Sequence, residues 1–204
     1  MRGSRKLSDA EVTAALSAAR GARNRAFLGA LTYLGGRISE VLALDLSDVC
    51  DGGLREAPIF VAEVTFRRRT TKGRRRGRAV ALHPQLRALL GLYIERERGM
   101  EPGPLFLARA GGKGQASDLR LSRTQGWKIV HRAFESAGVR DRATPHSFRK
   151  TFGSRAHAQG ARAKTVQEML GHADLRTTEL YLDSTEDAER AAVHSMPSYL
   201  GDTP

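Results

Sequence analysis

The feature that most limits the fold of this chain is one short stretch of β character between long stretches of helical periodicity. From Pro58 the sequence reads IFVAEVTF, continues through a basic segment that contains Gly73 and Gly77, and returns to apolar residues in RAVAL. Two apolar runs joined through glycines are typical of an antiparallel hairpin, here with a charged tip. We therefore expect an α+β fold that is mainly helical and carries a small antiparallel β-sheet or hairpin.

Helical periodicity dominates the rest of the chain. Ser8 and Glu11 predict a capping box at the start of a helix of about residues 9–20, and glycines predict the end of a second helix at Gly35. With 204 residues and no long linker, we expect one compact domain that buries roughly 70% of the unfolded surface. Further apolar residues at helical spacing place helices over about 38–44, 86–93 and 127–137, with Trp127 in the core.

The charge of the chain points to a polyanionic partner. Lys and Arg total 34 against 22 Asp and Glu, so the formal net charge is +12. Aromatic residues make up only 6%, which disfavours a stacking platform for RNA and favours double-stranded DNA.

Other classes are disfavoured by what the sequence lacks. No apolar stretch approaches the roughly 18 residues of a membrane span, and no secretory signal begins the sequence, so we expect a cytoplasmic, nucleoid-associated protein. Cys50 is the only cysteine, which excludes an internal disulfide and a Cys-rich zinc site. Without a clear carboxylate cluster a two-metal nuclease is disfavoured, and we expect no metal and no cofactor.

Two motifs near the end of the chain suit the attack of a tyrosine on a phosphodiester. TPHSFRKTFGS places His146 and Arg149 on one face of a helix that begins at Pro145. LGHADLRTTELYLD then places His172 after a helix that ends at Gly171, and Tyr181 follows nine residues later. Arginine binds phosphate through two parallel hydrogen bonds and stays protonated, so we expect Arg37 and Arg149 to clamp the nonbridging oxygens.

The remaining roles follow from proton chemistry. A phenol is mostly protonated near neutral pH, so Tyr181 as nucleophile needs a proton acceptor, for which His146 is the candidate. The leaving 5′-oxygen needs a proton donor, and an ammonium such as Lys72 in the hairpin tip suits that role. Glu40, one turn after Arg37, is expected to hold either Arg37 or His146 in place.

The basic run that contains Lys72 is expected to contact DNA as well. It holds eight Lys or Arg in twelve residues. A solvated hairpin tip is the usual interpretation of such a run, but on a chain of this charge we favour phosphate contact. The expected DNA-binding residues are Arg67, Arg68, Arg69, Arg74, Arg75, Arg76, Arg78 and Lys150.

Together these motifs resemble the tyrosine recombinase family of the phage-integrase type and, more distantly, the type IB topoisomerases. GGRISEVLALDLSDV resembles the first arginine box of the family and TTKGRRRGRAVAL its lysine hairpin; TPHSFRKTFGS and LGHADLRTTELYLD resemble its last two boxes. The resemblance implies the catalytic-domain fold of that family, a 3′-phosphotyrosyl intermediate and a free 5′-hydroxyl. Because the ester bond is exchanged, it also implies that neither ATP nor a metal is required. The residues that match are Arg37, Lys72, His146, Arg149, His172 and Tyr181.

We accordingly expect residues 1–183 to form the catalytic domain and residues 184–204 a C-terminal helix and tail, without the N-terminal clamping domain that most family members carry. We also expect self-association on DNA, from dimer to tetramer. The expected activity is site-specific recombination: integration, excision, inversion or resolution. Two alternatives stay open at this point: a helix-turn-helix-like DNA-binding regulator without chemistry, and an enzyme that relaxes supercoils like a type IB topoisomerase.

Overall fold

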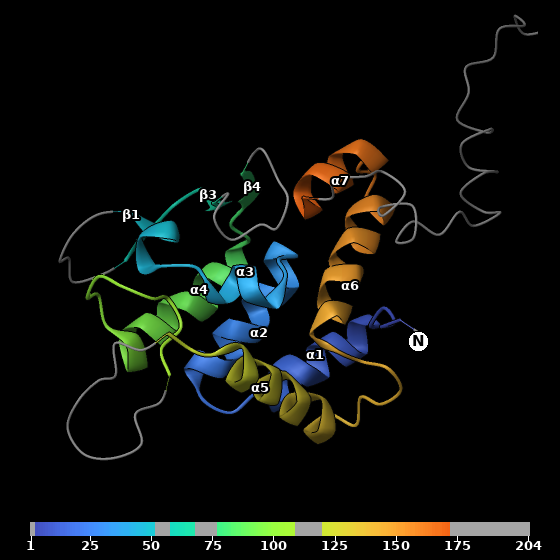
Figure 1. Ribbon diagram of the computed structural model, residues 1–204, viewed down its shortest axis with the longest axis horizontal. Coiled ribbons are helices and arrows are strands. Elements are labelled where there is room, and N and C mark those ends of the chain that lie inside the picture. The colour runs from blue at the N-terminus through green and yellow to red at the C-terminus, as the bar shows by residue number, and fades with distance from the viewer. Residues whose placement is uncertain (1–2, 52–57, 68–76, 109–119, 172–204) are drawn as a thin grey trace, which may run out of the picture.

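The computed structural model describes residues 3–51, 58–67, 77–108 and 120–171, and within them a mainly helical fold (Figure 1). The α-helices are α1 (Asp9–Ala18), α2 (Ala22–Leu34), α3 (Ile38–Leu42), α4 (Pro84–Tyr93), α5 (Arg123–Ser136), α6 (Pro145–Ala158) and α7 (Ala163–Leu170). A 3₁₀ turn covers Leu46–Asp48, and a π-helical turn, Ile94–Arg98, extends α4. The strands are β1 (Cys50–Asp51), β2 (Ile59–Phe60), β3 (Glu63–Phe66) and β4 (Arg78–Ala81).

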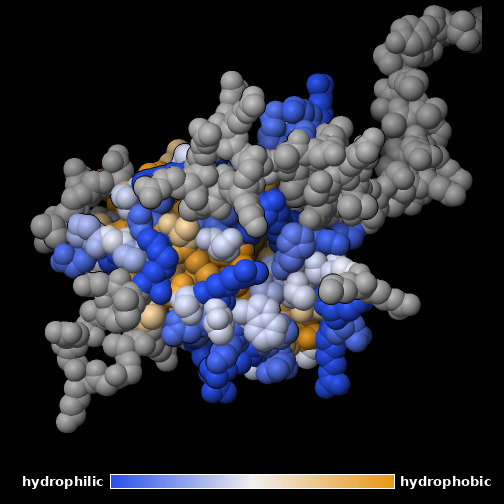
Figure 2. All heavy atoms as spheres, in the orientation of Figure 1, coloured by the Kyte–Doolittle hydropathy of each residue, from blue (hydrophilic) through white to orange (hydrophobic). Residues whose placement is uncertain are grey.

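Helix α2 forms the centre of the core. Its Phe27, Leu28 and Leu31 are fully buried, and the helix packs against α4 on one side and α6 on another (Figure 1). A Cβ atom at Gly29 would lie 2.6 Å from Leu89 Cδ1, so the absence of a side chain lets α2 and α4 approach closely. Helix α5 covers α1 and α3. The hydrophilic residues in the view of Figure 2 surround an apolar area near its middle.

The expected hairpin is present as the antiparallel pair β3 and β4, with Glu63 opposite Ala81 and Phe66 opposite Arg78. Only the second half of the run IFVAEVTF takes part in this hairpin, because β2 pairs with β1. The chain changes partner between two adjacent residues: Val61 N donates to Val49 O at 3.0 Å, whereas Ala62 O accepts from Leu82 N at 2.8 Å. The hairpin tip lies outside the described residues.

The predicted helix ends are confirmed where glycine or a capping side chain marked them. Ser8 and Glu11 form the expected capping box of α1. Helix α2 ends at Gly35 with φ 57°, and α7 ends at Gly171 with φ 68°, both in the left-handed region that glycine tolerates. Helix α6 begins at Pro145.

The prediction that Trp127 packs in the core was wrong. Its side chain is 48% exposed, and its ring lies against that of His131, 3.6 Å away between centroids. Gly126 takes the core position in this turn of α5, where a Cβ atom would lie 3.1 Å from Phe27 Cζ. The buried face of α5 therefore continues from Gly126 to Val130, and Trp127 lies beside it.

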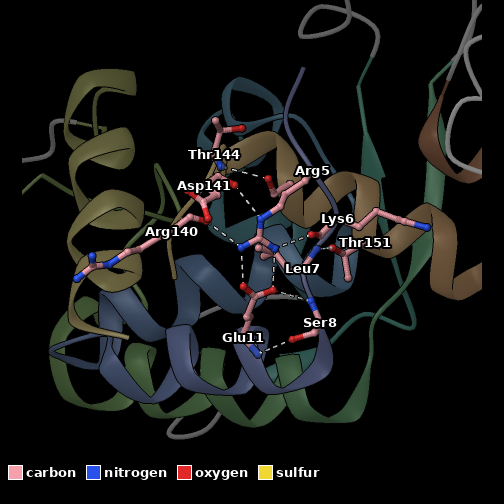
Figure 3. Close-up of polar contacts among 10 residues, drawn as sticks. Arg5, Lys6, Leu7, Ser8, Glu11, Arg140, Asp141, Thr144 and Thr151 are labelled. Atoms are coloured by element: carbon pink, nitrogen blue, oxygen red, sulfur yellow. Dashed lines mark hydrogen bonds and ion pairs between the residues drawn. The ribbon is translucent and has the colours of Figure 1, made fainter. Parts of the chain in front are cut away.

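An N-terminal strap, residues 5–8, holds α6 against the rest of the fold (Figure 3). Arg5 forms an ion pair with Glu11 and donates to the carbonyl oxygens of Arg140 and Asp141, both at 2.8 Å. The backbone N–H of Leu7 donates to Thr151 Oγ1 in α6 at 2.8 Å. The strap therefore fixes both α6 and the loop that leads into it.

Candidate active site

Helix α6 presents the two residues of the predicted H-x-x-R motif from its first two turns. The hydroxyl of Thr144 caps the helix by accepting from His146 N at 3.2 Å, and Thr144 N donates to Ser147 Oγ at 3.1 Å. This start places His146 at the surface and Arg149 inside, where its side chain is only 1% exposed.

The guanidinium of Arg149 joins the ends of two other helices. Nη1 donates to Gly35 O, at the C-terminus of α2, at 2.8 Å, and Nη2 donates to Leu170 O, in the last turn of α7. Carbonyl oxygens at helix C-termini carry partial negative charge, so a cation there is favourable. Arg149 thus fixes the end of α7, from which the chain continues to His172.

Glu40 is the anion at the centre of the site. Its fully buried carboxylate accepts from Arg37 N at 2.8 Å, Arg37 Nη1 at 2.9 Å and Arg78 Nη2 at 2.7 Å, and it lies 3.8 Å from Arg149 Nη1. Burial alone would raise the pKa of Glu40, but the hydrogen bond and charge of Arg78, the Arg37 N–H and the charge of Arg149 together hold it below its usual range. Of the two partners expected for Glu40, the structure shows Arg37.

Arg78, which we expected to bind DNA, lies in the interior. Its side chain is 7% exposed, and Nε donates to Met169 O in α7 at 2.9 Å. The buried negative charge of Glu40 accounts for this placement, because an unpaired carboxylate there would be strongly unfavourable. The sequence signal that separates Arg78 from its basic neighbours is its place at the start of a strand, opposite the apolar Phe66.

The imidazole of His146 belongs to the same cationic region. Its partial burial, together with the charges of Arg149, Lys150 and Arg37, lowers the pKa of His146 to about 4. At neutral pH the ring is therefore uncharged and able to accept a proton.

Among the other expected site residues, Arg37 is 44% exposed and lies at the start of α3. Arg67 is largely exposed and pairs with Asp48 at 2.7 Å, and Lys150 is half-buried on α6. The structure thus brings together Arg37, Glu40, His146 and Arg149. The expected residues Arg68, Arg69, Lys72, Arg74, Arg75, Arg76, His172 and Tyr181 lie outside the described residues.

The sequence and the fold are similar to those of known proteins. Residues 5–188 match the model of the phage integrase family. The chain belongs to the phage integrase family. It is 34% identical over 174 residues to the tyrosine recombinase XerD of Mycobacterium tuberculosis strain H37Rv, a match that covers 82% of this chain and 50% of XerD.

Two solved structures of recombinases have a fold similar to that of this integrase-family chain. The XerA recombinase superimposes with a TM-score of 0.72 at 24% identity, covering 97% of this chain and 68% of XerA. The XerH site-specific recombinase, in a pre-cleavage complex with its difH substrate, superimposes with a TM-score of 0.67 at 25% identity, covering 96% of this chain and 55% of XerH. The chain spans about half the length of the curated relatives that it matches.

The described part of this integrase-family chain shows no helix long and apolar enough to cross a membrane. Within the same residues, no three His, Cys, Asp or Glu side chains gather as they would around a metal ion.

Proposed function

We propose that this chain is the catalytic part of a site-specific DNA recombinase, which cleaves and rejoins strands through a 3′-phosphotyrosyl bond to Tyr181. One observation carries the proposal: Glu40 holds Arg37 and approaches Arg149 within 4 Å, beside a His146 that is neutral at pH 7. The membership in the phage integrase family and the DNA-bound XerH relative support the same activity.

In this proposal the cationic side chains stabilise charge that develops on the phosphoryl group. Arg37 donates a hydrogen bond to Glu40 through Nη1. Its side chain is about half exposed, which suits a contact with a phosphate of the DNA. Arg149 is held rigidly by two helix ends and adds positive charge next to His146. Preorganised charge of this kind commonly contributes on the order of 10²–10³ in rate per donor.

The proposed reaction exchanges one ester for another. The Tyr181 hydroxyl loses its proton to His146 and forms a bond to phosphorus, while the bond from phosphorus to the 5′-oxygen breaks. Lys72 gives the 5′-oxygen its proton, so that a free 5′-hydroxyl leaves. Attack of a 5′-hydroxyl from a partner strand reverses these steps, with no net hydrolysis. His172, which follows α7, is assigned a hydrogen bond to the same phosphate.

Double-stranded DNA is the proposed partner, with Arg67, Arg68, Arg69, Arg74, Arg75, Arg76 and Lys150 as phosphate contacts and self-association from dimer to tetramer on the DNA. Residues 1–183 are the proposed catalytic domain, and residues 184–204 a C-terminal helix and tail.

A nicked duplex tests the proposal. If the short strand beyond the cleaved bond diffuses away, the protein stays covalently attached to DNA and migrates as a slower band in a denaturing gel. We expect this band with the wild type and not with Tyr181→Phe, using duplexes tiled over the DNA that flanks the gene. Equal behaviour of the two proteins would support a binding regulator without chemistry.

A second assay separates recombination from relaxation of supercoils. A plasmid that carries two copies of the cleaved sequence should yield products with exchanged flanks, and a plasmid with one copy should not. Relaxed circles without exchanged products would support a topoisomerase-like enzyme instead.

A further inference from the structure

Arg78, the first residue of β4, contacts three separate parts of the candidate site. Nη2 donates to Glu40 in α3 at 2.7 Å, and Nε donates to Met169 O near the end of α7 at 2.9 Å. The guanidinium carbon lies 4.2 Å from the centroid of the Phe66 ring in β3. The side chain of Arg78 therefore connects the hairpin to α3, which Arg37 precedes, and to α7, which ends shortly before His172 in the sequence.

The surroundings leave this guanidinium little freedom. Phe66 is 1% exposed, and a Cβ atom at Gly36 would lie 2.9 Å from its Cζ atom, so the ring is wedged between Arg78 and the backbone next to Arg37. A buried charge is tolerated only where it is paired and hydrogen-bonded, which Glu40 and Met169 O provide. A lysine ammonium on a flexible stem lacks the planar fork that reaches both acceptors at fixed angles.

Two of the proposed catalytic residues are close in the sequence to the residues that form these contacts. Lys72 lies six residues before Arg78 in the hairpin, and His172 lies three residues after Met169. In the sequence, the residues that Arg78 contacts or adjoins are therefore few positions away from Lys72 and His172, the two groups that the proposed reaction places on the leaving oxygen and the phosphate. Through Glu40 it also fixes Arg37.

We propose that Arg78 is a positioning residue of the recombinase site, which holds the lysine hairpin, Glu40 and the end of α7 in one arrangement and does not itself bind DNA. The proposal rests on the proposed function, since it concerns how that site is assembled. The alternative role is a direct phosphate contact through Nη1, which is buried and has no hydrogen-bond partner among the described residues.

The salt dependence of DNA binding separates these two roles. A phosphate contact releases a counterion, so its loss reduces the slope of log K against log salt by about one. We expect Arg78→Met and Arg78→Lys to bind a random-sequence duplex with the wild-type slope. Arg87→Lys is the matched control, because Arg87 also lies over a phenylalanine, Phe60, at 6.0 Å but on the exposed face of α4. A slope lower by about one in Arg78→Met, the variant that removes the cation, and not in Arg78→Lys or Arg87→Lys overturns the proposal.

The cleavage rate at saturating nicked duplex tests the positioning itself. Misplacement of reacting groups by about 1 Å can cost on the order of 10²-fold in rate. We expect a loss of that order for Arg78→Met, a smaller loss for Arg78→Lys, and no loss for Arg87→Lys. Wild-type rates in both Arg78 variants overturn the proposal.

A substrate with sulfur in place of the bridging 5′-oxygen distinguishes positioning from general loss of structure. Sulfur leaves without a proton, so a defect that acts through displaced Lys72 should be relieved. We expect this substrate to restore most of the rate of Arg78→Met, as for Lys72→Ala. The proposal is overturned if the sulfur substrate does not relieve the loss of rate in either Arg78 variant and the loss equals the unfolded fraction that circular dichroism measures. Arg78 would then have only a structural role.

These outcomes stay separate from a failure of the proposed function. If the wild type forms no covalent adduct on any duplex, the recombinase proposal fails, whereas the salt slopes still decide whether Arg78 contacts DNA.

Urea unfolding of Arg78→Met, Glu40→Gln and the double variant measures the interaction energy between Arg78 and Glu40. Additive changes in the unfolding midpoint would show that Arg78 does not act through Glu40.

Discussion

Arg149 Nη1 donates a hydrogen bond to Gly35 O at 2.8 Å, which ties the second turn of α6 to the end of α2. The carbonyl faces the guanidinium because Gly35 ends α2 in the left-handed conformation, with φ 57°. Arg149, which we propose adds positive charge at the active site, is thereby held by backbone geometry that only glycine adopts without strain.

Gly35→Ala should be strongly destabilising. A left-handed alanine costs about 1–2 kcal/mol, and its Cβ atom would lie 2.3 Å from Phe152 Cδ1, which adds roughly 1–3 kcal/mol of overpacking. Gly138→Ala is the matched control, because Gly138 has φ 67° and no heavy atom within 4 Å of the added carbon. Urea unfolding at pH 7 should show a larger loss for Gly35→Ala; equal losses would mean that the Phe152 contact does not constrain this turn.

Glu40→Gln should also lower stability, by about 3–5 kcal/mol, because it leaves the buried Arg78 and Arg149 without their counter-charge. Glu168→Gln removes an exposed carboxylate that lies 3.7 Å from Lys164 and should cost less than about 0.5 kcal/mol. Chemical denaturation of the three proteins measures both changes. Similar small losses in the two variants would show that the buried carboxylate is not needed to balance the arginines.

The predicted helix ends show what local chemistry alone reveals. Ser8, Gly35, Pro145 and Gly171 were interpreted correctly because a cap or a left-handed turn depends on the residue itself and its immediate neighbours. For the same reason, the start of α6 at Pro145 could be predicted, and with it the position of His146 and Arg149 in the first turns of one helix.

The sequence was less informative where distant parts of the chain decide the structure. The change of partner between Val61 and Ala62 depends on where β1 and β4 lie, which strand periodicity does not contain. Gly126 occupies the buried position of this helical turn, but a glycine has no apolar side chain that would reveal this in the sequence. The neighbouring Trp127 was therefore assigned to the core. Arg78 is drawn inside by Glu40, 38 residues away along the chain. The hairpin tip and the segment with His172 and Tyr181 lie outside the described residues, so their assigned roles stay predictions.

The pKa of His146 should be about 4 in the DNA-free protein, as a pH titration followed by NMR of the imidazole would show. Because this pKa lies below the ordinary 6.5, the unfolded chain binds the proton more tightly. His146 therefore lowers stability progressively as the pH falls from about 6.5 to about 4. Lys150→Gln removes one of the neighbouring cations and should raise the pKa. An unchanged pKa would show that the charge of Lys150 does not contribute to the shift.

The ion pair between Arg5 and Glu11 should make the N-terminal strap sensitive to acid. The hydrogen bond from Arg5 lowers the pKa of Glu11 to about 2 from an ordinary 4.5. A lowered folded-state pKa gives stability that is fully present above about pH 4.5 and is lost as the pH falls toward 2. The difference in stability between the wild type and Glu11→Gln should shrink over that range in thermal melts. With Arg5→Gln as background the pH dependence of this difference should become smaller, because only the hydrogen bonds from Ser8 still lower the pKa of Glu11; an unchanged pH dependence would exclude Arg5 as the main cause.

We propose above that Arg37 and Arg149, which lie around Glu40, serve a covalent attack by Tyr181 on DNA. Protease digestion of the protein trapped on a nicked duplex, followed by mass spectrometry, identifies the residue that carries the nucleotide. We expect one modified peptide, with the 3′-phosphate joined to Tyr181, and no modified peptide from Arg149→Ala at equal DNA occupancy. A nucleotide joined to any other residue, or a trapped yield that Arg149→Ala leaves unchanged, would contradict the proposal.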